Sequence, residues 1–302
     1  MSSRFRAFLL LLAPLPALVV GVLIMRRSGV SASIVAQQLA AGLLLTIACL
    51  AICLRRRLTL NVTTPGSTVI AAAAPVVLLV LTLLHRGMDG IHRWVSIGPV
   101  QLHAGFVALP VLIIVAGTIA RSGSSRARWI ADGGIVIAAA TLAFQPDASQ
   151  AIAFAAAVVI VVLQRSAASR IDWIAATVCV GSSILALSRR DPLEAVPHVE
   201  GIVHLAASSG LTWLVASIVA LMLLPIPFVL NWVKHRDHHE GMGLAVYFVT
   251  VCIAALVAPF PVPVLGFGLS PVLGYFVALC WTVRTDAVST LPTAGERDRR
   301  AH

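Results

Sequence analysis

Apolar runs of about 20 residues follow one another along almost the whole chain, separated by short polar segments. A helix that crosses a bilayer needs a run of this length, because in lipid the backbone must satisfy its own hydrogen bonds. The composition agrees with this pattern: 59% of the 302 residues are hydrophobic and 11% are charged, against roughly 25% charged in soluble domains. The sequence therefore predicts an all-α polytopic membrane protein and excludes a soluble, disordered or fibrous chain.

The runs predict a bundle of about ten transmembrane helices. The run from 202 begins with weakly apolar turns, so we expect it to start as a re-entrant or interfacial segment, and Pro225 and Pro227 are expected to kink its far end. Residues 1–284 are expected to form one transmembrane domain, and 285–302 a polar, disordered tail. The expected helices cover 7–25, 33–54, 67–85, 101–120, 129–144, 149–164, 171–188, 202–233, 241–258 and 264–283.

Basic side chains are distributed unequally between alternate loops. With a cytoplasmic N-terminus, sixteen Lys and Arg residues fall in the inner segments and six in the outer segments. This asymmetry is typical of membrane proteins, whose cytoplasmic loops are rich in Lys and Arg. We therefore expect both termini in the cytoplasm, and we attribute the net charge of +10 to topology and contact with anionic membrane lipid rather than to nucleic-acid binding.

Four polar or irregular segments fall on the outer side in this topology: 85–98, 145–147, 189–200 and 259–271. Polar residues in a membrane protein often mark function. Each segment also has a purely structural interpretation. The first can be a loop with an aromatic membrane anchor, the second a helix start, the third a solvated loop and the fourth a linker.

The functional interpretation assigns chemistry to side chains in these segments. Arg93, Arg189 and Arg190 are candidates for contact with phosphate, and Trp94 lies next to the first of them. Arg93 is expected to serve function more than folding, with Asp147 as its candidate partner. A carboxylate beside a histidine at a membrane surface can act as a general base, which makes Glu200 and His198 candidates as well.

Spacing gives no indication of a resident metal or cofactor. The five cysteines lie inside apolar runs without a CxxC pair, so neither a disulfide framework nor a thiolate metal site is expected. Segment 234–240 contains three histidines, but no further ligand cluster completes a metal site there.

In order and spacing, the four outer segments resemble the SEDS family, the FtsW/RodA/SpoVE proteins. The family's first segment usually runs G-x-x-R-W-I-x-x-G-P, and the chain has matching residues at Gly90, Arg93, Trp94, Gly98 and Pro99. The family's next signature, Q-P-S-E, is replaced by the residues at 103–106.

The remaining motifs are similar but eroded. The family's Q-P-D matches 145–147, and the Pro pair, Gly268 and Ser270 resemble its last motif. Glu200 is the acidic residue nearest the position of the family's proposed catalytic Asp. The paired acidic residues that follow in the family fall near Ser208 and Ser209.

The resemblance implies a multi-pass protein of the bacterial cytoplasmic membrane in peptidoglycan synthesis, cell shape or cell division. One hypothesis is a glycosyltransferase that polymerises the lipid-linked precursor at the outer face, with Glu200 as the base. Arg93, Trp94, Asp147, Arg189, Arg190, His198 and Ser270 would then bind substrate. A divalent cation can accompany the substrate pyrophosphate, and a transpeptidase of the penicillin-binding class is the expected protein partner.

Two other hypotheses remain. The chain can be a non-catalytic relative that binds the precursor or scaffolds a wall-synthesis partner. A lipid or solute transporter is the third, but the predicted helices contain little charge, which argues against ion-coupled transport.

Overall fold

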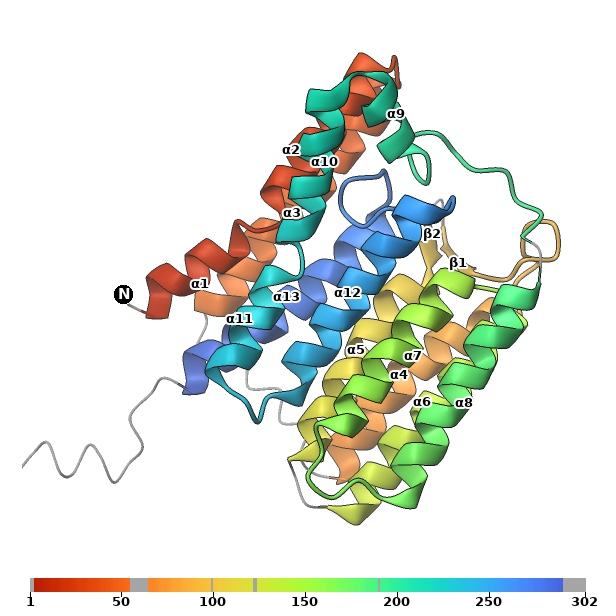
Figure 1. Cartoon of the computed structure of the whole chain (residues 1–302), viewed down its shortest axis with the longest axis vertical. Helices are drawn as coiled ribbons and strands as arrows, with labels where there is room; N and C mark the ends of the chain where they lie inside the picture. Colours follow the sequence, from red (N-terminus) through yellow and green to blue (C-terminus); the bar gives the residue numbers. More distant parts are fainter. Residues whose placement is uncertain (1–2, 55–64, 99, 122–123, 190, 290–302) are drawn as a thin grey trace, which may run out of the picture.

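The computed structural model describes residues 3–54, 65–98, 100–121, 124–189 and 191–289. Within these residues the chain forms a bundle of long helices with one small hairpin at one end (Figure 1). We call that end, where strands β1 (Trp94–Ile97) and β2 (Val100–His103) lie, the site end. The helices are α1 (Ser3–Leu11), α2 (Leu15–Arg27), α3 (Ala32–Leu54), α4 (Pro65–Thr82), α5 (Ala104–Ala120), α6 (Ser125–Phe144), α7 (Ala148–Leu163), α8 (Arg170–Ser188), α9 (Ile202–Ser208), α10 (Leu211–Leu223), α11 (Ile226–Lys234), α12 (His239–Val257) and α13 (Leu269–Ser289).

Helical segments occupy the position of each predicted span, so the predicted polytopic helical fold is confirmed. Within the described residues, six segments are long and apolar enough to cross a membrane, and three shorter apolar helices lie between them. Helix α13 continues to Ser289, past the boundary that we predicted at 285. The rest of the predicted tail lies outside the described residues.

The predicted span at 202–233 is divided into three helices. Gly210 separates α9 from α10, because its backbone angles, φ 120° and ψ 161°, are not helical. This conformation is accessible almost only to glycine. Pro225 then separates α10 from α11, as expected of a residue that lacks the backbone N–H. The expected proline break is therefore present, and the run from 202 does begin with a separate short helix; that this helix is re-entrant or interfacial stays a prediction.

The core is built from α5, α7, α12 and α13, which pack closely because small residues line their contacts. A Cβ added to Gly274 of α13 would lie 1.8 Å from the Phe106 carbonyl oxygen of α5. Buried rings fill the space beside this contact: Phe228 stacks on Phe248 at 5.1 Å between centroids, and Tyr275 meets Phe248 edge-on at 5.1 Å. These contacts fix the helices that lead to the site end.

Ion pairs fix the opposite end of the bundle. Arg165, in the turn after α7, pairs with Asp172 of α8 and donates to the Ala116 carbonyl of α5 at 3.0 Å. Arg121, after α5, pairs with the buried Glu240 of α12 at 2.5 Å. These charges are therefore neutralised by partners within the bundle.

Helices α9 and α10 pack against α2 at one side of the molecule (Figure 1). The outward face of α10 exposes large apolar side chains that no described element covers: Leu211, Val215, Val219 and Met222. Such a face is expected of a helix in contact with lipid tails rather than with water.

Candidate functional site

The end of the first predicted outer segment forms a β-hairpin with the residues that follow it, where the sequence predicted a loop and then, from 101, a helix. Trp94 pairs with His103 and Ile97 with Val100, around a turn in which Gly98 has φ 59°. The hairpin ends at His103, the N-cap of α5. It therefore attaches the polar segment after α4 directly to the core helix α5.

Arg93 precedes β1 and joins three segments of the chain. Its side chain is 8% exposed. It donates to the Asp191 carboxylate at 2.7 Å and to the Pro146 carbonyl at 2.7 Å. Its partner is thus Asp191, in the segment after α8, and the predicted pairing with Asp147 is wrong. The neighbouring residue Pro146 supplies a backbone carbonyl in place of the Asp147 carboxylate.

Asp147 lies beneath this contact and is fully buried. It is the N-cap of α7, where its Oδ1 accepts from the Gln150 N–H at 3.4 Å, so the structural interpretation as a helix start is correct. Its Oδ2 has no protein hydrogen bond and lies 3.4 Å from His103 Nε2. Asp147 therefore caps a helix with one oxygen and faces the hairpin with the other.

His103 connects the hairpin to the last predicted segment. Its backbone N–H donates to the buried Ser270 Oγ at 2.8 Å, at the start of α13. Its ring meets Trp94 edge-on at 5.5 Å between centroids. Trp94 and Ser270, both predicted site residues, thus both contact His103, which the sequence analysis noted only as a departure from the motif.

Glu200 lies in a tight turn before α9. The Val196 N–H donates to Glu200 Oε2 at 2.9 Å, and the Glu200 N–H donates to the Val196 carbonyl at 3.0 Å. Burial raises the pKa of the Glu200 carboxyl above its ordinary value. The charges of Asp191 and Arg93 also act on it in opposite directions, so the turn belongs to the same electrostatic environment as the Arg93 pair.

The turn packs on the proline-rich segment that precedes α13. The Phe267 N–H donates to the His198 carbonyl at 2.8 Å, and the His198 ring lies 5.8 Å from the Phe267 ring. A Cβ on Gly266 would lie 2.4 Å from the Val199 carbonyl oxygen. Burial lowers the pKa of His198, which favours the neutral ring. The third and fourth predicted segments are therefore in direct contact.

Gln38 of α3 is a site-end residue that sequence reasoning missed. It is buried, and its amide donates to the carbonyls of Val264 and Gly266 at 2.9 and 3.0 Å and accepts from the Gly268 N–H at 3.1 Å. All of these partners lie in the irregular segment before α13. The signal in the sequence was an amide inside an apolar run, where an unpaired polar group is costly.

The other predicted arginines have different outcomes. Arg189 donates to the Ala143 carbonyl at 3.1 Å and to the Phe144 carbonyl at 3.4 Å, so it caps the end of α6. Arg190 lies outside the described residues. Of the three arginines predicted to contact phosphate, Arg93 is the one that the structure brings into the cluster of the four segments.

Several buried polar atoms of this cluster have no hydrogen-bond partner in the described part of the protein. They are Arg93 Nε, His103 Nδ1, Asp147 Oδ2 and Gln150 Nε2. Buried polar atoms are usually satisfied, so a group of unsatisfied ones needs an explanation. Gln150 Oε1, by contrast, accepts from the Tyr247 hydroxyl at 2.5 Å, which fixes the orientation of its amide.

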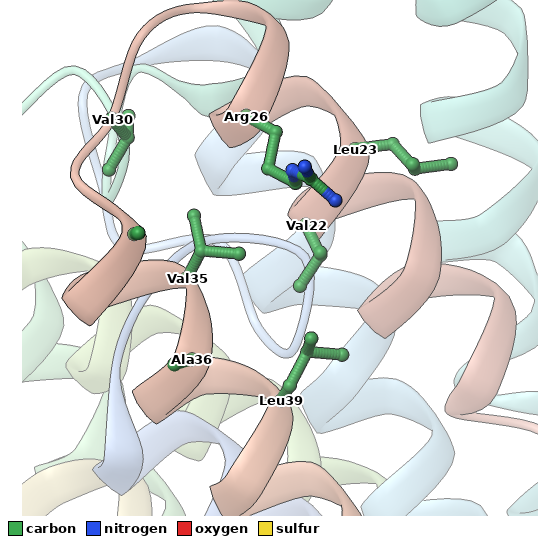
Figure 2. A pocket seen from close by; sticks show the side chains of 8 residues that line it. Val22, Leu23, Arg26, Val30, Val35, Ala36 and Leu39 are labelled. Carbon is green, nitrogen blue, oxygen red and sulfur yellow. The ribbon is translucent and has the colours of Figure 1, made fainter.

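An apolar groove of about 350 Å³ runs between α2 and α3 at the site end (Figure 2). Arg26 supplies the one charged side chain among its lining residues, and Figure 2 shows it beside Val22 and Leu23, with Val35 and Leu39 across the groove. Both helices also contact the irregular segment before α13: a Cβ on Gly21 would lie 2.0 Å from the Leu265 carbonyl oxygen, and Gln38 binds the segment as described above. The groove therefore adjoins the cluster of the four segments.

No family model and no curated protein sequence matches the chain. Solved structures do match. The rod shape determining protein RodA of Thermus thermophilus has a TM-score of 0.70 at 20% identity, over 94% of this chain and 97% of that chain. A mutant of the same RodA gives 0.69 at 20% identity, over 94% and 98%.

A chain from a structure on the structural coordination of polymerization and crosslinking by a peptidoglycan synthase complex gives a TM-score of 0.67 at 18% identity, over 94% of this chain and 98% of that chain. At such identities the likeness shows the fold. The chain therefore has the polytopic helical fold of RodA, and the resemblance to the SEDS proteins is confirmed at that level.

Proposed function

We propose that this protein acts in bacterial peptidoglycan synthesis, as a SEDS-like glycosyltransferase that polymerises the lipid-linked precursor at the outer face of the cytoplasmic membrane. The observation that carries the proposal is the meeting of the four motif segments at one end of the bundle, around buried polar atoms that lack protein partners. A polar, partly unsatisfied site at the end of an apolar bundle suits a substrate with a charged head and an apolar tail.

Glu200 is the proposed general base in this reaction. A base must take the proton of the acceptor sugar hydroxyl, and it works best when its pKa lies near the working pH. The raised pKa of Glu200 supports this role. The hydrogen bond from the Val196 N–H orients one carboxylate oxygen.

Arg93 is proposed to bind the charged head of the substrate, and the groove between α2 and α3 its apolar tail. The guanidinium of Arg93 is proposed to meet the pyrophosphate, since arginine suits phosphate geometry and its Nε has no protein partner. The groove between α2 and α3 offers an apolar surface for the polyprenyl tail. A divalent cation enters the proposal only as a companion of the substrate pyrophosphate.

A transpeptidase of the penicillin-binding class is the proposed protein partner. One of the matching folds belongs to a peptidoglycan synthase complex that coordinates polymerization and crosslinking. The exposed apolar face of α10 suits contact with the membrane helix of such a partner as well as contact with lipid.

A second candidate function is a non-catalytic relative that binds the precursor or scaffolds the partner. Three observations favour it. Asp191 neutralises the charge of Arg93, a backbone N–H already occupies Glu200 Oε2, and the hydroxyls of Ser208 and Ser209 donate to the Leu205 carbonyl at 2.9 and 2.8 Å. The resemblance leads one to expect acidic residues at these serines.

Purified protein with lipid-linked precursor, alone and with a transpeptidase partner, separates the two functions. The first proposal expects glycan chains in at least one of the two conditions. Precursor that stays bound but unpolymerised in both would reject the enzyme and support the second function. Precursor that is neither bound nor polymerised would reject both the enzyme and precursor binding, and would leave scaffolding of the partner as the second function.

A further inference from the structure

Three cysteine thiols meet inside the bundle, although sequence spacing gave no indication of a thiolate site. Cys49 and Cys53 lie one turn apart on α3, and Cys280 comes from α13. The three sulfur atoms lie within 4.8 Å of one another. Among the residues that the structure describes, this is the one group of three potential metal ligands with such a geometry.

The spacing of the sulfurs suits a metal ion. A metal bound about 2.3 Å from each of three thiolates holds the sulfur atoms about 4 Å apart, so the cluster needs a contraction of less than about 1 Å. A disulfide would use two of the sulfurs and leave the third unexplained. The shared position of three thiols is therefore accounted for more completely by one metal ion than by a cross-link.

The ligand set identifies the class of metal. Every donor in the cluster is a soft sulfur atom, and soft thiolates select Cu(I) and similar thiophilic ions. Structural zinc sites are almost always four-coordinate, whereas this cluster supplies three ligands. Arg284, one turn beyond Cys280, acts on Cys280 and Cys53 and offsets the negative charge that metal-bound thiolates carry.

The cluster is accessible and lies away from the site end. Cys49 is buried, with its Sγ 3.7 Å from the Phe276 carbonyl oxygen, whereas Cys53 and Cys280 are half-buried, so an ion can enter on their side. In the orientation proposed above, this end of α3 faces the cytoplasm, where thiols stay reduced. The same two helices supply Gln38 and Ser270 to the site end.

We propose that Cys49, Cys53 and Cys280 form a binding site for a soft, thiophilic metal ion of the Cu(I) type, which clamps α3 against α13. The site is independent of the glycan chemistry at the other end of the molecule. Its function is to bind an ion and to stabilise this helix pair, since a ligand that binds only the folded state raises its stability.

The test is an anaerobic titration of the reduced, purified full-length protein with Cu(I) against a chromophoric chelator of Cu(I). The wild type should bind one Cu(I) per chain and melt at a higher temperature when loaded. The Cys53→Ser variant should bind at least about tenfold more weakly, because it loses a direct ligand and loss of even an outer-shell partner costs about 10- to 100-fold in affinity. The Cys280→Ser variant provides the same readout from the other helix.

The matched control is a double variant, Cys179→Ser with Cys252→Ser, which removes the buried cysteines outside the cluster. It should bind Cu(I) as the wild type does. Absence of stoichiometric binding, equal binding by Cys53→Ser and Cys280→Ser, or a disulfide among the three residues under reducing conditions would each overturn the proposal. Melting of the metal-free variants shows that loss of binding is not loss of the fold, and none of these measurements depends on polymerase activity.

Discussion

At the scale of single residues, Arg93 shows how a functional prediction and a structural role meet in one side chain. Because it is an arginine in a polar outer segment, the sequence predicted contact with a phosphate group. The sequence also indicated that Arg93 serves function more than folding, whereas the structure shows it buried, with donor bonds to Asp191 and to the Pro146 carbonyl, which favours a role in stability as well. Sequence reasoning could identify the residue because motif letters are local, but it could not identify Asp191, which is 98 residues away.

The first prediction is that Arg93→Ala destabilises the protein. Loss of the guanidinium leaves the Asp191 carboxylate and a buried carbonyl without their donor, which costs about 2 to 3 kcal/mol for bonds to a charged group. Arg86→Ala, in the same segment but exposed, is the matched control and should change the free energy of unfolding by less than about 0.5 kcal/mol. The measurement is unfolding in detergent by denaturant. Equal stability of the two variants would contradict the structural role and leave Arg93 with substrate binding alone.

At the scale of elements, hydropathy predicted the helices well because a bilayer imposes their length and their apolar character. It did not predict the β1–β2 hairpin, because strands of four residues are too short to show a periodicity and β2 adjoins the apolar run of α5. Of the two breaks in the span at 202–233, the sequence predicted the one at Pro225, because proline lacks the backbone N–H. It did not predict the one at Gly210, which depends on the backbone angles that this glycine adopts.

The second prediction concerns the break between α9 and α10. Gly210→Ala forces a side chain into a backbone region that glycine alone adopts easily, at a cost on the order of 1 to 3 kcal/mol. Gly181→Ala is the control, because Gly181 lies inside α8 and a Cβ there meets nothing within 4 Å. Thermal melting should show a loss for Gly210→Ala and no loss for Gly181→Ala. If both variants melt together, the angle at Gly210 is not what separates the two helices.

At the scale of the whole molecule, the fold was predictable while the pairing of distant segments was not. The order of the four motif segments indicated that they belong together, and they do meet at one end. The contact of Gln38 with the segment before α13 and the meeting of three cysteines join residues more than 200 positions apart. Helix packing alone determines such contacts, so a single sequence does not reveal them.

The third prediction is the orientation of the bundle. The unequal distribution of Lys and Arg predicts that both termini lie in the cytoplasm and the site end outside. Reporter fusions after Arg57 and Arg128 should report the cytoplasm, and fusions within 86–93 and 191–197 the outer side. A cytoplasmic signal from 191–197 would put the Arg93–Asp191 pair on the wrong side of the membrane for precursor polymerisation.

The proposed role of Glu200 is to take the proton in polymerisation of the lipid-linked precursor, and comparing the turnover of Glu200→Gln with that of the wild type tests it. Glutamine keeps the size of the side chain and an acceptor oxygen for the Val196 N–H, but it cannot act as a base. Glu194→Gln, on an exposed residue of the same segment, is the matched control. We expect Glu200→Gln to lower turnover by a factor on the order of 100 to 10,000 and Glu194→Gln to leave it unchanged. If Glu200→Gln polymerises the precursor as fast as the wild type does, Glu200 is not the base.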